Sequence, residues 1–136
     1  MKFKLEIIKN LKKFKFKNFK EQSGTLTPLY VGDHLPNNFK LKRLFFVYGK
    51  KKYLRADHAH KKCSQIIFPV IGKVKITTFF KKRKKIFFLD QKKGTALTVP
   101  IHAWIRIKFF KDNDCILTAC NYKYDKKNIF QILKHF

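Results

Sequence analysis

The 136-residue chain is poor in acidic side chains, in arginine and in cysteine, and these shortages exclude several classes of protein. Its three cysteines form no CxxC pair and no metal-ligand spacing, which favours a reducing compartment over a disulfide framework. No apolar run approaches the roughly 20 residues that span a bilayer. The N-terminus alternates charged and apolar residues and lacks the apolar region of a signal peptide, so we expect a cytoplasmic protein with no membrane partner.

Only eight acidic residues accompany 33 basic ones, which gives a formal net charge of +25. Such a charge raises the question of nucleic-acid binding. Only four of the basic residues are arginine, however, the side chain whose planar fork suits bases and phosphates. The lysines occur in nearly every segment and form no single stripe. The sequence therefore predicts no nucleic-acid partner, and a positive field that attracts anionic small molecules such as nucleotide diphosphates.

Size and composition predict a single domain over residues 1–136, because hydrophobic residues make up 45% of a chain of this length. Short β-rich runs alternate with turn signals after residue 40, a pattern typical of an all-β sandwich or barrel such as a jelly roll. Apolar spacing over residues 125–135 predicts a short C-terminal helix. The expected strands are 41–48, 65–71, 74–80, 86–89, 96–99, 104–110 and 115–122.

The most informative segment is Arg55-Ala-Asp-His58-Ala-His60-Lys-Lys-Cys-Ser-Gln65, followed by Gly72. Two histidines two residues apart on a strand point to the same face. The spacing resembles the first cupin motif, HxH-x4-E-x6-G, with Gln65 in place of the usual metal-binding glutamate. This substitution shifts the interpretation from a metal site towards two histidines that are free to move protons.

The second cupin motif is also incomplete. Gly94 and Pro100 have the expected interval, but His102 stands where glycine is usual, and Ile105 stands where the third metal-binding histidine would fall. Two of four ligands hold a divalent ion poorly, because such sites usually take three or more protein groups. The sequence therefore predicts no metal and no other cofactor, unless His102 turns into the barrel.

Without a metal, His58 and His60 have two interpretations. One histidine is a satisfied core residue and the other lies at the surface, or the pair is an active site. Histidine titrates near neutrality, so a pair can take a proton from one carbon and return it to a neighbouring one. A polar cluster with Arg55 and Gln65 inside a barrel must be hydrogen-bonded or serve function. We therefore take this cluster as the best candidate active site.

Over roughly residues 20–131 the chain resembles the cupin-fold sugar 3,4-ketoisomerases, which act on dTDP-4-keto-6-deoxyglucose. The resemblance implies a cupin-type jelly-roll barrel and a cofactor-free transfer of a proton between C3 and C4 through an enediol(ate). It also implies a dTDP-linked 4-keto-6-deoxy sugar as ligand and a homodimer, with exchanged N-terminal strands as one arrangement. The matching positions are Arg55, His58-Ala-His60-Lys61, Gln65, Gly24-Thr-Leu26, Arg43-Leu-Phe-Phe46, Gly94, Pro100, Trp104 and Tyr124-Asp125.

The resemblance assigns expected roles to these residues. His60 is the expected base and His58 the partner acid. Arg55 and Gln65 are candidates for stabilising the oxyanion, or for bracing the histidines or binding phosphate. The remaining candidates for substrate binding are Arg43 and Arg106 as diphosphate contacts or solvated strand charges, and Trp104 as a base-stacking or core residue.

Departures from the family pattern leave alternatives open. Phe45 and Phe46 replace tyrosines that are common on the aromatic strand, so a phenolic proton relay needs Tyr48, Tyr53 or water. A dTDP-sugar epimerase of similar fold is the first alternative function. A metal-free cupin that only binds an anionic ligand is the second, and a metal-dependent dioxygenase is the last. The sequence does not fix the stereochemistry at C4 of the product.

Overall fold

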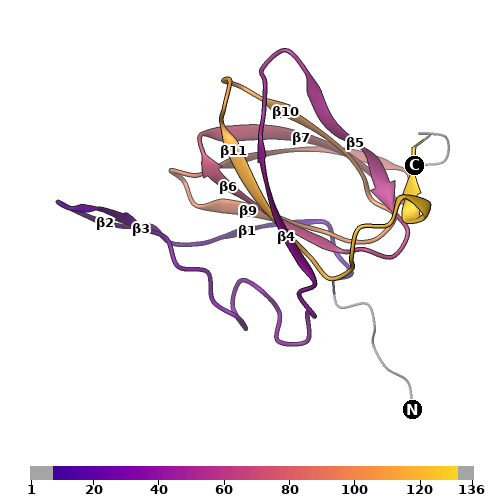
Figure 1. Ribbon diagram of the computed structural model, residues 1–136, viewed down its shortest axis with the longest axis horizontal. Coiled ribbons are helices and arrows are strands. Elements are labelled where there is room, and N and C mark those ends of the chain that lie inside the picture. Colours follow the sequence, from indigo (N-terminus) through magenta and orange to yellow (C-terminus); the bar gives the residue numbers. More distant parts are fainter. Residues whose placement is uncertain (1–7, 132–136) are drawn as a thin grey trace.

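The computed structural model describes residues 8–131, which form two five-stranded antiparallel sheets packed face to face and one small hairpin (Figure 1). The predicted all-β cupin-type jelly roll is confirmed. The first sheet has the order β1 (Lys12–Lys15), β9 (Thr95–Val99), β6 (Gln65–Ile71), β11 (Cys115–Cys120), β4 (Arg43–Tyr48). The second has the order β12 (Ile129–Phe130), β5 (Leu54–His60), β10 (Trp104–Phe109), β7 (Lys73–Phe80), β8 (Arg83–Asp90). The hairpin pairs β2 (Phe19–Glu21) with β3 (Gly24–Leu26).

The buried apolar side chains form two hydrophobic clusters. The first lies between the two sheets and contains inward side chains of both, including Ile67, Ile107 and Phe109. The second lies on the outer face of the first sheet, where the N-terminal segment covers residues such as Phe68. Because β6 is buried on both faces over most of its length, its sequence is a continuous apolar run rather than an alternating one.

The glycine of the first motif has a steric role in this fold. Gly72 has a φ of +76°, a conformation that side chains with a Cβ rarely adopt. A Cβ built there would also come within 2.2 Å of a carboxylate oxygen of Asp114. Gly72 is therefore required for the tight β6–β7 turn, which lies at the far end of β6 from Gln65.

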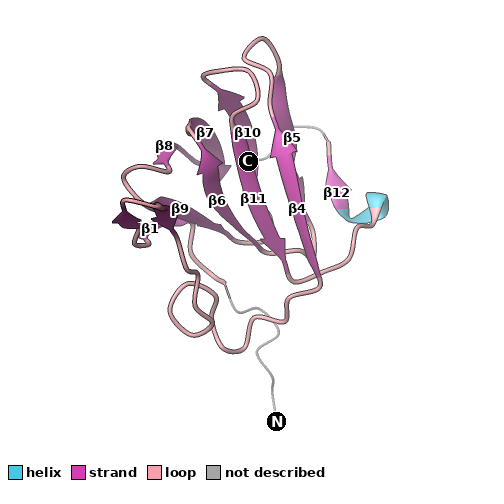
Figure 2. Cartoon of the chain, turned by 60° about the vertical axis from the view of Figure 1, so that its left-hand side comes forward, coloured by secondary structure: helices cyan, strands magenta, loops and turns pink. Residues whose placement is uncertain are grey.

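The predicted C-terminal helix is mostly wrong within the described residues. Only one turn of 3-10 helix forms, η1 (Lys126–Asn128), and the Asp125 side chain caps it by accepting a hydrogen bond from the backbone N–H of Lys127. The chain then turns extended as β12 and pairs with β5 (Figure 2). The open edge of β5 offers hydrogen bonds to an extended segment, and this outweighs the local helical pattern. Residues 132–135 of the predicted helix lie outside the described residues.

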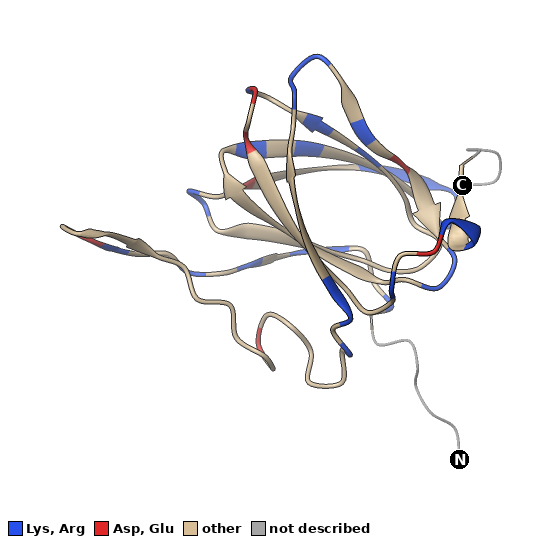
Figure 3. Ribbon diagram, in the orientation of Figure 1, with Lys and Arg blue, Asp and Glu red and all other residues tan. Residues whose placement is uncertain are grey.

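Lys and Arg occur on strands of both sheets and in their connecting turns, as Figure 3 shows. This distribution matches the scattered lysine pattern of the sequence. Within residues 8–131, no helix is long and apolar enough to cross a membrane.

Candidate active site

A β-bulge interrupts β5 immediately before the histidines. The pairing of β5 with β10 shifts register between Ile105 and Arg106, opposite the Ala56–Asp57 step. Ala56 and Asp57 both have left-handed backbone, with φ of 65° and 58°. This conformation costs a non-glycine residue roughly 1–2 kcal/mol. Bulges of this kind re-aim the side chains that follow, so the bulge sets the direction of His58 and His60.

We expect Ala56→Gly to raise the free energy of unfolding by about 0.5–1 kcal/mol, because glycine adopts positive φ without steric cost. Ala59→Gly is the matched control, since Ala59 is fully buried on the same strand with no positive φ. It should lower the free energy of unfolding by about 0.5–1 kcal/mol. Urea denaturation of both variants measures the difference, and equal destabilisation by both would contradict the assigned strain.

Residues directly opposite each other on two antiparallel strands have their side chains on the same face of the sheet. The partners of the β5 residues on β10 therefore show which way the β5 side chains point. His58 pairs with Ile105, a member of the core between the sheets, so its side chain points inwards. His60 lies two residues further along and points the same way. Arg55 pairs with Ile107 of the same core, but its side chain is exposed. The strand therefore presents all three residues on one face, with Arg55 at its solvent-exposed part.

The two histidines lie in contact. Their ring centroids are 4.8 Å apart and the rings meet edge to face at 75°. Among the described residues, Nδ1 of His58 and Nε2 of His60 are buried and have no hydrogen-bond partner. Such buried ring nitrogens are costly unless a ligand or water uses them. This pair is therefore arranged to receive hydrogen bonds or protons from a bound molecule.

Both histidines favour the neutral form. Burial lowers the pKa of His58, and the neighbouring charge of Asp57 opposes this effect only in part. Burial, together with the charges of His58 and Arg43, lowers the pKa of His60 to about 4. At neutral pH the pair is therefore uncharged and able to accept a proton.

Arg43 brings a positive charge to the histidines from the facing strand β4. Its guanidinium lies over the ring of Phe45 at 4.8 Å and over that of Tyr124 at 5.4 Å, measured to the ring centroids. Its Nε is buried and unpartnered among the described residues. The sequence-predicted Arg43 thus lies within the histidine site, with a free donor for a bound ligand.

Gln65 lies at the start of β6 and is almost fully buried, with 3% of its surface exposed. Its Nε2 donates to the sulfur of Cys120 at 3.6 Å, and Nη2 of Arg43 donates to the same sulfur at 3.8 Å. Sequence reasoning missed Cys120, because its neighbours are set by strand pairing rather than by spacing along the chain. Cys120 pairs in register with both Arg43 and Gln65, which are 22 residues apart in sequence.

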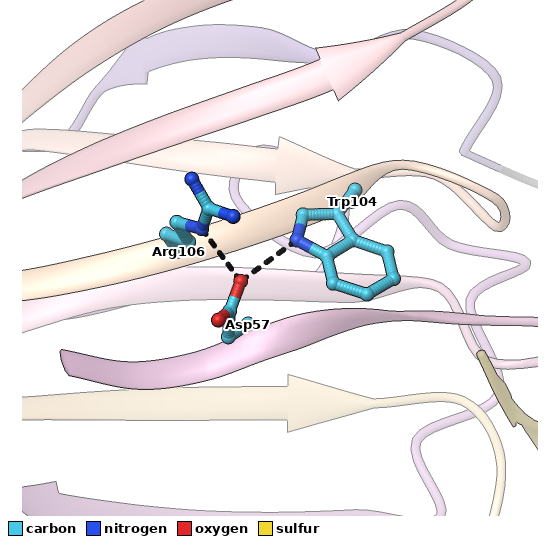
Figure 4. A network of polar contacts seen from close by, with 3 residues as sticks. All are labelled: Asp57, Trp104 and Arg106. Atoms are coloured by element: carbon cyan, nitrogen blue, oxygen red, sulfur yellow. Dashed lines mark hydrogen bonds and ion pairs between the residues drawn. The ribbon is translucent and has the colours of Figure 1, made fainter. Parts of the chain in front are cut away.

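Trp104 and Arg106 do not join this cluster. They alternate with the inward Ile105 on β10, so they point to the outer face of the second sheet. There Trp104 Nε1 and Arg106 Nε both donate to one carboxylate oxygen of Asp57, at 3.0 and 2.6 Å (Figure 4). Trp104 and Arg106 therefore lie apart from His58 and His60, and their roles in substrate binding stay predictions. The bulge turns Asp57 to this outer face, where it accepts both hydrogen bonds.

Tyr48 and Tyr53, the tyrosines considered for a proton relay, lie at the surface. Tyr48 alternates with the inward Phe45 and is 61% exposed, and Tyr53 is 65% exposed. Tyr124 is the tyrosine whose ring contacts the site, through Arg43. It comes from the C-terminal segment, which β12 holds against β5.

His102 does not turn towards the histidine pair. Its side chain is exposed and its ring lies 5.9 Å from that of Phe130, while its backbone N–H donates to the carbonyl of His60. Across residues 8–131, no three His, Cys, Asp or Glu side chains form a group suited to a metal ion. The polar groups described at the site are therefore two imidazoles, one guanidinium, one amide and the sulfur of Cys120.

A cavity of about 490 Å³ lies elsewhere, at the other end of β6 and β11. Gly72, Asp90 and Asp114 are among the residues that line it, and no histidine does. It is separate from the histidine cluster, which lies where β6 begins and β11 ends.

The chain matches the family FdtA, described as WxcM-like, C-terminal, over residues 9–136. No curated protein matches it. A similar solved structure is QdtA, a sugar 3,4-ketoisomerase from Thermoanaerobacterium thermosaccharolyticum in complex with TDP, at 25% identity and a TM-score of 0.80, covering 93% of this chain and 91% of that one. The WlaRB TDP-quinovose 3,4-ketoisomerase from Campylobacter jejuni is 22% identical with a TM-score of 0.80, covering 92% and 95%.

An epimerase shares the fold at greater distance. The RmlC epimerase from Mycobacterium tuberculosis is 11% identical with a TM-score of 0.76, covering 86% of this chain and 66% of that one. Identity at this level shows a common fold and no more. Because the family match spans all but the first eight residues, the chain belongs to the FdtA family of sugar 3,4-ketoisomerases and is an isomerase.

Proposed function

We propose that the protein converts dTDP-4-keto-6-deoxyglucose into a dTDP-3-keto-6-deoxyhexose without a metal. The observation that carries the proposal is the pair of contacting, neutral histidines, each with a buried ring nitrogen that lacks a partner among the described residues. The substrate class is supported by QdtA, since a histidine-to-asparagine mutant of that enzyme, 24% identical to this chain, was solved in complex with TDP-4-keto-6-deoxyglucose.

The chemistry follows from the two imidazoles. His60 takes the proton from C3, and the C3–H electron pair forms the C3–C4 double bond of an enediolate while the C4 carbonyl oxygen gains the negative charge. The C4 oxygen takes the proton of the C3 hydroxyl, and the negative charge passes to the C3 oxygen. His58, after it has received a proton from His60 or from solvent, then donates it to C4 as the carbonyl forms at C3. The number of protons is conserved and no oxidant is needed. Two adjacent bases on one strand face suit transfer between neighbouring carbons.

The developing oxyanion needs a positive or hydrogen-bonding group nearby. Arg43 meets this need through its buried free Nε, and it acts from the strand that faces the histidines. Gln65 holds Arg43 indirectly, because both donate to the sulfur of Cys120. We assign the anionic diphosphate to Arg55, whose side chain is exposed on the strand that carries the histidines. Tyr124, whose ring lies 5.4 Å from the guanidinium of Arg43, is our candidate phenol for proton exchange at an oxygen.

Product analysis tests this function. Chelator-treated protein is incubated with dTDP-4-keto-6-deoxyglucose, and carbon NMR locates the ketone. A ketone at C3 supports the proposal, and the configuration at C4 then distinguishes the gluco from the galacto product. An unchanged ketone at C4 with inverted centres at C3 or C5 would identify an epimerase. Binding without any change would identify a non-catalytic protein.

We also propose a homodimer. Among the described strands, none pairs with the outer edge of β4, whose outward side chains Leu44 and Phe46 are 54% and 57% exposed. The β2–β3 hairpin projects away from the sheets in Figure 1, and its Leu26 is 66% exposed. An apolar face beside an unpaired edge favours a second copy as its cover. The predicted exchange of segment 2–8 falls almost wholly outside the described residues, so it stays a prediction.

We expect Phe46→Glu to convert the dimer into a monomer, because a buried unpaired carboxylate opposes association. Phe88→Glu is the control, since Phe88 is 51% exposed on β8 of the other sheet. Light scattering coupled to size-exclusion chromatography gives the mass of each variant. A monomeric wild-type protein, or equal dissociation by both substitutions, would contradict this interface.

A further inference from the structure

Two hydrogen-bond donors converge on one sulfur in the histidine site. Cys120 ends β11 and pairs with Arg43 on one side and with Gln65 on the other. Its Sγ accepts from Arg43 Nη2 at 3.8 Å and from Gln65 Nε2 at 3.6 Å. The thiol of Cys63, in the turn between β5 and β6, donates to the carbonyl of Ser64 at 3.5 Å. Sulfur as a neutral thiol is a weak acceptor, so two donors, one of them charged, are suited to a thiolate.

The charges around this sulfur lead to the same conclusion. Arg43 is half-buried with a buried Nε, and the one ion pair among residues 8–131 joins Arg106 to Asp57 on the opposite face of the second sheet. Asp125, the acidic residue next to Tyr124, is engaged in capping η1. A cation held partly out of water without a counter-charge is costly. The groups that act on the sulfur are Arg43 of β4, Gln65 of β6 and Cys63 of the turn between β5 and β6.

We propose that Cys120 is a thiolate at neutral pH and acts as the counter-charge of Arg43, a positioning residue that holds Arg43 and Gln65 beside the histidine pair. The thiolate gives the site the negative charge that a carboxylate usually supplies to an arginine.

The titration behaviour of the two thiols supports this arrangement. Interaction with the Cys63 side chain, followed by the hydrogen bonds from Gln65 and Arg43, lowers the pKa of Cys120 to about 6 despite its burial. The same interaction and burial raise the pKa of Cys63, which therefore stays a thiol. One proton is thus removed from the pair, and it leaves from the sulfur that accepts a hydrogen bond from Arg43.

The ultraviolet absorbance of the thiolate, followed against pH on the full-length protein without substrate, tests the proposal. Wild type and the control Cys115→Ser should each show a single thiolate step with a midpoint near 6. Cys120→Ser should lack that step, and Arg43→Gln should move it to higher pH. A wild-type protein that forms no thiolate before the ordinary range of cysteine, or a step that persists in Cys120→Ser, would overturn the proposal.

The catalytic consequence rests on the proposed function and has its own readout. Serine keeps a hydrogen-bond acceptor but carries no charge, so Cys120→Ser should lower kcat more than it changes KM at neutral pH, because Arg43 loses the charged partner that positions it. A merely structural role would lower the amount of active enzyme and leave kcat per active site and KM unchanged. If Cys120→Ser does not fold, the wild-type and Arg43→Gln titrations decide alone. The titration needs no substrate, so a negative result would overturn the thiolate proposal without affecting the ketoisomerase proposal. Conversely, a protein without ketoisomerase activity could still show the thiolate step.

Discussion

His60→Asn is expected to reduce kcat for dTDP-4-keto-6-deoxyglucose by about 10²–10⁴-fold, the usual contribution of a positioned acid–base group. Asparagine keeps a polar side chain of similar size but cannot take up the proton from C3. Because Nε2 of His60 has no partner among the described residues, the substitution breaks no described hydrogen bond of that atom. We therefore expect the melting temperature to change little while turnover is lost.

His102→Asn is the matched control. His102 is exposed, has a φ of 70° that asparagine tolerates, and contacts His60 through its backbone only. It should leave turnover near the wild-type value. Equal losses in both variants, or full activity in His60→Asn, would remove His60 from the mechanism.

The pH profile gives a second readout on the same residue. Since burial and neighbouring positive charge lower the pKa of His60 to about 4, its neutral form persists well below the ordinary histidine range. kcat/KM should therefore fall only when the pH drops through the lowered pKa values of the pair. A fall centred on the unperturbed histidine pKa of about 6.5 would contradict the buried arrangement.

Arg43→Gln is expected to reduce kcat by about 10²–10³-fold, the typical effect of removing one donor to a developing oxyanion. The reason is that Arg43 combines a buried free Nε with a position opposite the histidines. KM should change less than kcat, because the enediolate carries more charge on this oxygen than the bound ketone does.

Arg106→Gln provides the comparison for Arg43→Gln. It removes the same kind of side chain from β10, but on the outer face, where Arg106 contacts Asp57. In steady-state kinetics, kcat of Arg106→Gln should exceed kcat of Arg43→Gln by at least tenfold, which corresponds to about 1.4 kcal/mol. If Arg106→Gln lost more kcat than Arg43→Gln, the substrate would bind on the outer face of the second sheet, and our assignment of the site would be wrong.

Much of the site follows from local sequence rules. The alternation of side chains along a strand predicts that His58 and His60 share a face, and the motif spacing predicts that Gln65 lies close to them. The contact between the two histidine rings confirms the first. Gln65 is linked to Arg43 through the sulfur of Cys120, and its closeness to the histidines stays a prediction. The strand 65–71 has the predicted limits, because its apolar run is long and ends at Gly72.

The remaining features depend on pairing between distant strands. The bulge at Ala56–Asp57 arises from the register of β5 against β10, and it sends Asp57 to Trp104 and Arg106. No spacing of residues along the chain indicates this bulge. Cys120 joins the site only through its register with Arg43 and Gln65.

The C-terminal segment shows the same limit. Its apolar spacing fits a helix, yet Ile129 and Phe130 pair with β5 because that strand has an edge to fill. Tertiary hydrogen bonds outweigh a weak local preference in so short a segment.

The most direct test of proton transfer by the histidine pair is proton NMR of dTDP-4-keto-6-deoxyglucose incubated with chelator-treated protein in D2O. The account predicts a 3-keto product that carries deuterium at C4 and has lost the C3 hydrogen, with neither change in His60→Asn. A substrate that keeps its C3 hydrogen and its C4 ketone in the presence of wild-type protein would contradict it.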